Sequence, residues 1–336
     1  MGTEEGERSY KLGLAAVVAS SVLFSCKSVF FKICYRYGTD PVVLQALRSA
    51  CAAPFFVWPL VAHRFRPART PVLALSGREL AAMAALGIVG YYLASIFDMV
   101  GLKYVSAGTE RLTLYVYPTL VVIFSALIFR KRIPKALYWP LGLSYAGIAL
   151  SFGGEAAGPA GGRPYLGGFL VFMSAVFYAL FLVGQGRMVH RVGPGRFAAI
   201  CMLVAGIAIS AHFLLRFPLS ALVQPAPVYW IAAATSVFCS VVPVYLYGYG
   251  VRAVGAGKAA VVSSVGPVST LVLAGALLGE TTGMFQAAGL VLVLAGSLLL
   301  GMDRSRLKTD VRQKAAFPSG AEAATVSEGA AGRGQT

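Results

Sequence analysis

Ten apolar runs, each close to the length of a helix that spans a lipid bilayer, dominate the chain. They recur from Leu12 to Met302 with short connections between them. A hydrocarbon core of about 30 Å needs about 20 apolar residues per helix. The runs cover residues 12–33, 41–62, 79–99, 108–129, 136–153, 166–186, 197–216, 228–249, 258–278 and 283–302. The pattern predicts an all-α integral membrane protein with ten transmembrane helices.

The composition favours a lipid environment over soluble alternatives. Hydrophobic residues make up 57% of the 336 residues, above the roughly 45 to 50% of soluble domains. The apolar runs are continuous rather than alternating, which disfavours a β-barrel. The net charge of +16 comes from residues at helix ends, not from a basic patch interleaved with aromatic residues. We therefore expect the lipid bilayer, and no nucleic acid, as partner.

Lysine and arginine are concentrated in alternate connections, which predicts the orientation of the chain. Clusters such as Arg64 to Arg78 and Arg130 to Lys135 lie on one side, and the other side has few basic residues. The basic side is expected to be cytoplasmic, and an even number of spans places both termini there. The first run is too long for a signal peptide, and the N-terminus does not resemble a transit peptide. A bacterial inner (plasma) membrane is expected, with an organellar membrane as the alternative.

Signatures of enzymes, metal sites and cofactor sites are missing from the sequence. The five cysteines lie within or at the ends of apolar runs without CxxC spacing, and the three histidines are isolated, so neither a disulfide framework nor a metal site is expected. No HExxH, GxSxG or phosphate-binding glycine loop is present. We expect no enzymatic activity, no cofactor and no metal.

The chain consists of two related halves. A shift of 149 positions aligns GLKYVSAG (101–108) with GVRAVGAG (250–257) and carries Pro118 onto Pro267. Five spans per half is an odd number, so the second half enters the membrane inverted, an arrangement typical of secondary transporters. We expect a cytoplasmic N-terminus (1–11), a first repeat (12–153), a linker (154–165), a second repeat (166–302) and a cytoplasmic tail that is basic and then disordered (303–336).

Several segments resemble the drug/metabolite transporter superfamily, and within it the EamA group of ten-helix carriers. They are FFKICYRYGTDPVVLQALRSA and YVSAGTERLTLYVYPTLVVIFSALIF in the first half, and VGAGKAAVVSSVGPVSTLVLAGALLGE, which ends in Glu280, in the second. The resemblance implies two inverted five-helix bundles that move small metabolites, amino acids or drugs, often outward. One departure is Lys131 in FRKRI, where the first half of such proteins commonly has a glutamate.

Five ionisable side chains are expected at a similar depth, on the outward side of the first repeat. They are Lys27, Arg48, Asp98, Glu110 and Arg111. A charge at membrane depth costs about 2.5 to 3.5 kcal/mol on insertion scales, so each needs a partner or a water-filled cavity. Glu110 and Arg111 are adjacent and do not face each other on a helix. Each is expected to have a different partner.

Two roles remain open for Asp98, and one is favoured for Arg48. Asp98 is either a proton-coupling carboxylate or the fixed ion-pair partner of Lys27, Arg48 or Arg111. The cluster holds one cation more than it holds acids, and the planar guanidinium of Arg48 suits a carboxylate or phosphate. An anionic or zwitterionic substrate is therefore expected.

Helical spacing adds polar and aromatic candidates for the wall of a cavity, although tight helix packing would explain them equally well. These candidates are Tyr91, Ser95, Tyr115, Tyr178, Tyr247 and Ser263. Pro118 and Pro267 occupy equivalent places in two spans, and matching interruptions point to a binding region or hinge.

The sequence thus predicts a secondary transporter that exports a small organic metabolite by alternating access. The expected substrate is amino-acid-like, zwitterionic or anionic. No ATP-binding motif is present, so proton coupling, another gradient or exchange would supply the energy. A channel-like facilitator and a non-transport membrane scaffold are the alternatives. Both a monomer and a homodimer are compatible with the sequence.

Overall fold

A computed structural model describes residues 2–62, 75–130, 135–156, 163–255, 258–259 and 262–299, and within those ranges the regular structure is helical throughout. The first half contains α1 (Gly2–Arg36), α2 (Pro41–Ala62), α3 (Gly77–Gly87), η2 (Ile88–Leu93), α4 (Ala94–Gly101), α5 (Ala107–Leu114), α6 (Tyr117–Ile128), η3 (Lys135–Leu137) and α7 (Tyr138–Ala156). The second half contains α8 (Pro164–Val192), α9 (Pro194–Arg216), η4 (Leu219–Leu222), α10 (Ala226–Ser236), η5 (Val237–Val241), α11 (Val242–Val254), α13 (Val265–Leu278) and a last helix, Met284–Leu299. The tail and the middle of the linker (157–162) predicted from the sequence lie outside the described residues.

The helices have the length and the surface of membrane-spanning segments. Seven described helical segments are long and apolar enough to cross a bilayer, and α13 and the last helix are shorter apolar helices. Trp58, Trp139 and Trp230 are more than 70% exposed and lie near the ends of α2, α7 and α10. Exposed tryptophans at helix ends are typical of membrane interfaces. The prediction of an all-α integral membrane protein is confirmed.

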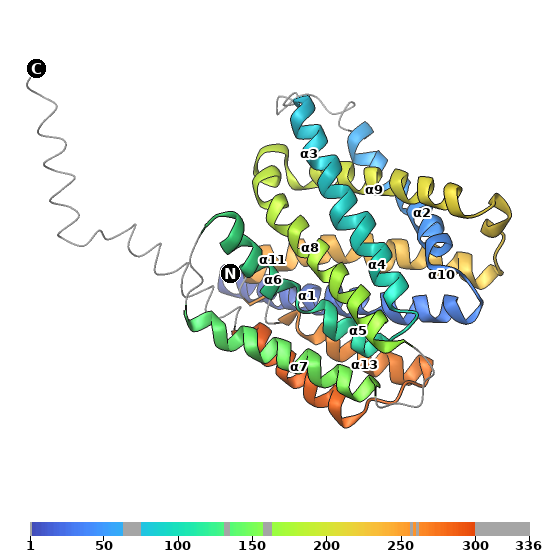
Figure 1. Cartoon of the computed structure of the whole chain (residues 1–336). Coiled ribbons are helices and arrows are strands. Elements are labelled where there is room, and N and C mark those ends of the chain that lie inside the picture. Colours follow the sequence, from blue (N-terminus) through green and yellow to red (C-terminus); the bar gives the residue numbers. More distant parts are fainter. Residues whose placement is uncertain are drawn as a thin grey trace, which may run out of the picture.

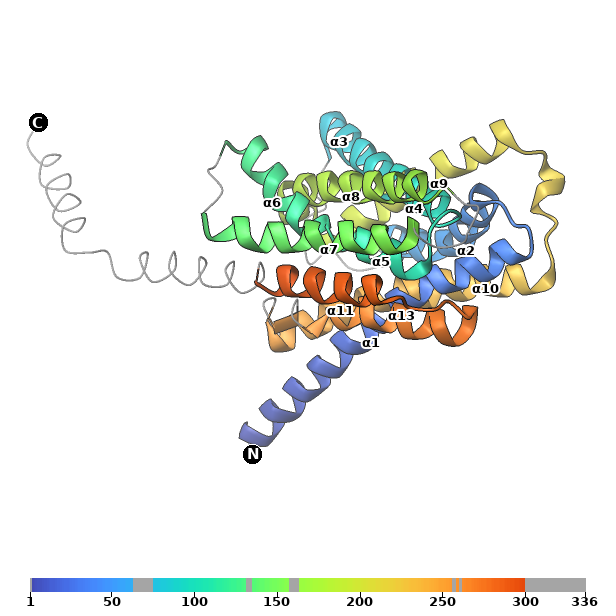
Figure 2. The same ribbon diagram turned by 60° about the horizontal axis from the view of Figure 1, so that its bottom comes forward.

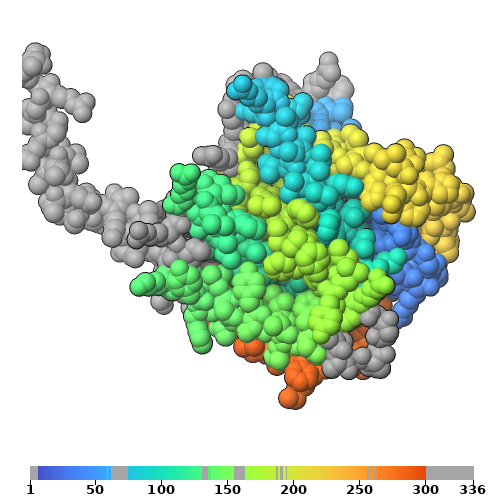
Figure 3. Space-filling view, viewed as in Figure 1, coloured from blue at the N-terminus to red at the C-terminus, as the bar shows by residue number. Residues whose placement is uncertain are grey.

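The helices of one half pack between those of the other. Helix α1 packs against α11 and α13 of the second half, and α8 packs against α4, α5 and α6 of the first. Figure 1 shows α2, α9 and α10 together on one side of the bundle, with α7 on the opposite side. Helix α7 lies beside the last helix in Figure 2. Figure 3 shows α3, α4, α6 and α7 close-packed around α8 on one face.

Close helix contacts follow an inverted repeat. A Cβ added to Gly101 of α4 would lie 2.9 Å from the carbonyl oxygen of Gly167 in α8, and one added to Gly250 of α11 would lie 2.8 Å from that of Gly13 in α1. The first contact joins the third span of one half to the first span of the other. The second contact is the same pair with the halves exchanged, which is the relation that a pseudo-two-fold axis produces.

The third span of each half contains a π-helical turn at the same place. The turn η2 lies between α3 and α4, and the turn η5 lies between α10 and α11. They begin at residues 88 and 237, which is the 149-residue shift of the sequence alignment. A π-turn inserts one extra residue and re-aims the side chains that follow it, and such turns are frequent at functional sites.

The fourth span of each half is broken at equivalent points. Helix α5 ends at Leu114 and α6 begins at Tyr117, with Pro118 in its first turn. In the second half a turn at 263–264 precedes α13, which contains Pro267. A proline lacks the N–H that would bond the carbonyl four residues earlier. The two prolines therefore explain why both helices are discontinuous at matching positions.

The contact between α7 and the last helix generates a stability prediction. A Cβ on Gly147 would lie 2.6 Å from the carbonyl oxygen of Gly289, whereas one on Gly142, in the same helix, meets nothing within 4 Å. We expect Gly147→Val to lower the free energy of unfolding by about 1 to 3 kcal/mol through overpacking. Gly142→Val is the matched control. Thermal unfolding of both variants in detergent checks the packing, and equal midpoints would contradict it.

Candidate functional site

Lys27 of α1 and Asp98 of α4 form an ion pair inside the bundle. The Lys27 Nζ lies 2.8 Å from the Asp98 Oδ2, and the Asp98 side chain is only 4% exposed. Helix α4 follows directly on the π-turn η2, which sets the direction of its side chains. The structure therefore places Asp98 against Lys27, one of the three cations that the sequence offered as partners.

Glu110 is fully buried and joins the same group. The hydroxyl of Ser28, next to Lys27 on α1, donates to the Glu110 Oε2 at 2.6 Å. The carboxyl groups of Asp98 and Glu110 lie near each other, and the Asp98 Oδ1 and the Glu110 Oε1 have no donor among the described residues. Two acids thus lie near Lys27.

Arg48 of α2 is buried and is held by neutral groups. Its Nη1 donates to the Gln45 Oε1 at 2.7 Å, and its Nη2 donates to the Ser240 Oγ of η5 at 3.0 Å. Its guanidinium also lies 4.6 Å from the ring centroid of Phe31, and the Nζ of Lys27 lies 5.7 Å from the same centroid. Cation–π contact with one buried ring thus supports two cations.

Arg111 lies apart from these partners, near the break between α5 and α6. It is half-buried, and its Nε is buried without an acceptor among the described residues. It lies close to Tyr115, Tyr117 and Tyr178. Glu110 and Arg111 therefore have different surroundings, as their adjacency on the helix suggested.

The remaining candidates gather around this break or flank it. Tyr115 and Tyr247 both lie beside Ser263, at the break before α13. The Tyr91 ring packs 4.7 Å from that of Phe181. Ser95 is half-buried on α4, one turn before Asp98.

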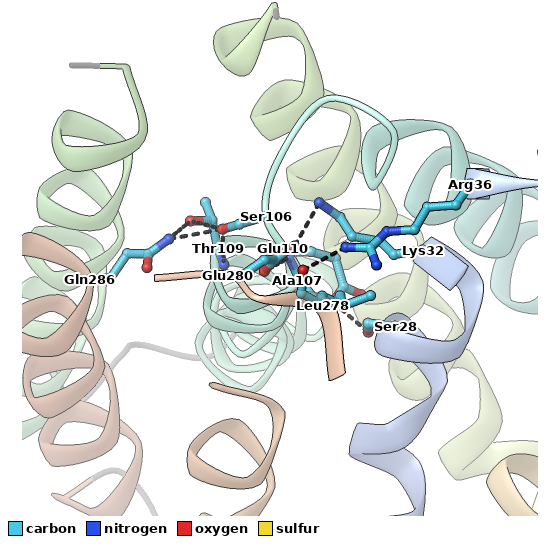
Figure 4. A network of polar contacts seen from close by, with 10 residues as sticks. All are labelled: Ser28, Lys32, Arg36, Ser106, Ala107, Thr109, Glu110, Leu278, Glu280 and Gln286. Carbon is cyan, nitrogen blue, oxygen red and sulfur yellow. Dashed lines mark hydrogen bonds and ion pairs between the residues drawn. The ribbon is translucent and has the colours of Figure 1, made fainter. Parts of the chain in front are cut away.

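One end of the bundle is closed by a second polar network, drawn in Figure 4. The Lys32 Nζ of α1 lies 2.9 Å from the Glu280 Oε1, and the backbone N–H of Ala107 donates to the Glu280 Oε2 at 2.9 Å. The Nη2 of Arg36 donates to the carbonyl of Leu278 at 2.5 Å. Gln286 donates to the hydroxyls of Ser106 and Thr109 at 2.8 and 2.9 Å. We call these residues the Glu280 network; it joins α1 and α5 to the second half.

The local sequence explains the position of Glu280. Gly279 adopts a left-handed conformation (φ 70°) that ends α13, and the N–H of Glu280 returns to the carbonyl of Ala274. Such a glycine C-cap is a common helix stop. The carboxylate then meets the N-terminus of α5, where the helix dipole favours negative charge. Lys131, at the equivalent place of the first half, lies outside the described residues.

Sequence reasoning had no signal for several of these contacts. Ser28, Phe31 and Gln45 each follow or precede a charged candidate by one helical turn or less, but apolar and small polar residues in a transmembrane helix are too common to single out. Glu280 appeared only as the end of a family motif, and its partner Lys32 only as a family-spaced residue.

An inverted-repeat helical bundle with buried charges is typical of membrane transporters. The chain belongs to the EamA-like transporter family, whose model matches residues 11–153 and 165–302. The uncharacterized transporter YcbK of Bacillus subtilis (strain 168) is 29% identical over 91% of this chain and 97% of its own length. The uncharacterized transporter YyaM of the same organism is 26% identical over 63% of this chain and 70% of its own length.

A solved crystal structure supports the fold. It aligns with 88% of this chain and 98% of its own length at a TM-score of 0.60, with 19% sequence identity. The predicted resemblance and the two repeats of five helices are confirmed.

The pair between Lys27 and Asp98 predicts a strong energetic coupling. Asp98→Asn leaves a cation uncompensated inside the bundle, so we expect a loss of about 3 kcal/mol in the free energy of unfolding. Lys27→Met combined with Asp98→Asn should lose clearly less than the sum of the single changes. A double-mutant cycle of unfolding in detergent measures this coupling.

The exposed pair of Lys11 and Glu7 on the same helix, at 2.7 Å, is the control. Its coupling should be about 0.5 kcal/mol or less. Equal coupling energies for the two pairs would show that the inner pair is not a buried one.

The Glu280 network predicts a graded loss of stability. Glu280→Gln removes the ion pair with Lys32 but keeps an acceptor for the N–H of Ala107, so a loss of about 1 kcal/mol is expected; Glu280→Ala removes both and should cost about 2 kcal/mol. Asp40→Asn is the control, because Asp40 also accepts an N–H at a helix start but lies 3.6 Å from Lys103 at the surface. If thermal unfolding shows that Asp40→Asn loses as much stability as Glu280→Ala, the role assigned to the Glu280 network is contradicted.

Proposed function

We propose that the protein is a secondary transporter that exports a small organic metabolite, amino-acid-like and zwitterionic or anionic, by alternating access. The observation that carries the proposal is the set of buried charges between two inverted repeats, beside helix breaks at matching positions. Ionisable groups at membrane depth are expensive and mark transport pathways. Discontinuous helices at the interface of inverted repeats form the binding sites of many transporters.

The Glu280 network supports alternating access. It joins α1 and α5 of one half to the end of α13 and the last helix of the other, and so it closes one end of the bundle. A pseudo-two-fold axis implies a second state in which the opposite end closes. Pro118 and Pro267 would be the hinges of this exchange. A channel-like facilitator needs a path open at both ends, which the network opposes.

The membrane and the orientation belong to the same proposal. The basic connections favour the cytoplasmic side for both termini, which makes the Glu280 network the outer end. A bacterial inner membrane is the location we propose.

The Asp98 and Glu110 pair supports a proton as the coupling ion. The two carboxyl groups and Lys27 lie together inside the bundle, and Lys27 balances only one of the two acids. A proton on the other acid would balance it, and loss of that proton would leave an uncompensated negative charge, which favours a change of state or of partner. Exchange of one solute for another is the alternative source of energy.

Metabolite profiling of cells and medium tests the function. Cells that express the chain are compared with cells that express Lys27→Met/Asp98→Asn at equal membrane levels, since this double variant removes the charges together. We expect one class of solute to accumulate in the medium only with the unaltered chain. Identical profiles for the two would contradict export through this site.

A further inference from the structure

We propose that Arg111 is the anion-binding residue of this transporter, and that it takes the carboxylate of a small monocarboxylate with an aromatic or other apolar body. The inference rests on the proposed function and names its substrate class. It moves the anion site from Arg48, which the sequence favoured, to the point where the broken spans of the two halves meet.

Arg111 differs from Lys27, Lys32 and Arg48, the other charged candidates inside the described bundle, in its lack of a partner. Lys27 and Lys32 have carboxylates at 2.8 and 2.9 Å. Arg48 donates to Gln45 and Ser240. Within the described part of the chain, Arg111 forms no ion pair within 4 Å, and its buried Nε has no acceptor. An arginine at membrane depth whose N–H donors lack acceptors can donate hydrogen bonds to a bound anion.

The position of Arg111 coincides with the crossing of the two broken spans. It lies on the last turn of α5, four residues before Tyr115, which lies beside Ser263 at the break before α13. A Cβ added to Gly266 of α13 would lie 3.4 Å from the Arg111 Nη2. The guanidinium therefore lies against α13 of the second half, at a glycine position where a larger side chain would contact it closely. A ligand here would contact both repeats, as a ligand carried by alternating access must.

The tyrosines around Arg111 supply walls for an apolar body. Tyr117 at the start of α6 and Tyr178 of α8 each keep part of their surface accessible. Their ring centroids are 5.3 Å apart in an edge-to-face arrangement, and those of Tyr115 and Tyr117 are 6.2 Å apart. Aromatic faces bind planar or apolar groups, and hydroxyls nearby can bond a carboxylate.

The charge balance selects a monoanion. A guanidinium that has no acidic partner balances the charge of one carboxylate, whereas a phosphate dianion would need a second cation. The acid next to Arg111 in the sequence, Glu110, accepts from Ser28 and lies near Lys27 and Asp98, so an ammonium group would compete with Lys27 for it. A simple monocarboxylate therefore fits better than a zwitterion.

Equilibrium binding of radiolabelled phenylacetate to the purified full-length protein in nanodiscs tests the site. Phenylacetamide and phenethylamine, of similar shape but neutral and cationic, are the competitors. We expect saturable binding of phenylacetate and competition by the other two that is weaker by at least about tenfold. Arg111→Gln should weaken phenylacetate binding on the order of 10- to 100-fold.

A matched pair of variants decides between the two arginines. Arg111→Lys and Arg48→Lys both keep the charge and lose the planar fork. We expect Arg111→Lys to weaken binding about fivefold or more, and Arg48→Lys less than about twofold. Arg216→Gln, at the exposed end of α9, should leave binding unchanged. Unfolding midpoints and size-exclusion profiles confirm that each variant is folded.

Several outcomes would overturn the site. They are the absence of saturable phenylacetate binding, equal competition by phenylacetamide, or a larger loss for Arg48→Lys than for Arg111→Lys. These results are distinct from failure of the proposed function. Binding that depends on Arg111 without solute export would support the binding site and contradict the proposed transport function. Export without such binding would support the transport function and contradict the binding site.

Discussion

A charge inside a membrane protein must be compensated within the protein, and the arrangement of this bundle follows from how its five inner charges are compensated. Lys27 and Asp98 neutralise each other, with Glu110 beside them. Arg48 relies on an amide, a hydroxyl and an aromatic ring. Arg111 forms no ion pair within 4 Å in the described structure, and its buried Nε, like that of Arg48, has no acceptor there. Lys27 and Arg48 therefore have side-chain partners inside the bundle, whereas Arg111, where the broken spans cross, has none among the described residues.

The scaffold is symmetric and the charges are not. The π-turns and the helix breaks recur in both halves at the same shift, and the glycine contacts recur with the halves exchanged. At that shift Asp98 corresponds to Tyr247, and Glu110 to Ala259. The inner ionisable groups thus belong to one repeat, and the other contributes hydroxyls and small residues. A symmetric frame can exchange two states, while an asymmetric set of charges makes those states unequal in energy.

Much of this fold could be predicted from the sequence because it depends on length and periodicity. Ten apolar runs, an odd number per half and the pairing of Pro118 with Pro267 are visible without coordinates. The site was harder to predict, because it depends on the directions in which side chains point. Tyr91 and Asp98 were placed on one face by ideal helical spacing, but Tyr91 lies within a π-turn from Ile88 to Leu93. Neither the choice of Lys27 for Asp98 nor the isolation of Arg111 follows from spacing, since both depend on how helices distant in the sequence pack together.

The central claim is that solute binds where the two broken spans cross, on Arg111. A crystal structure of the protein with 4-bromophenylacetate, with data collected at the bromine absorption edge, tests it most directly. The account predicts one bromine peak among Tyr115, Tyr117 and Tyr178, with the carboxylate on the Arg111 guanidinium. A peak beside Arg48 or Lys27 instead, with Arg111 unoccupied, would contradict it.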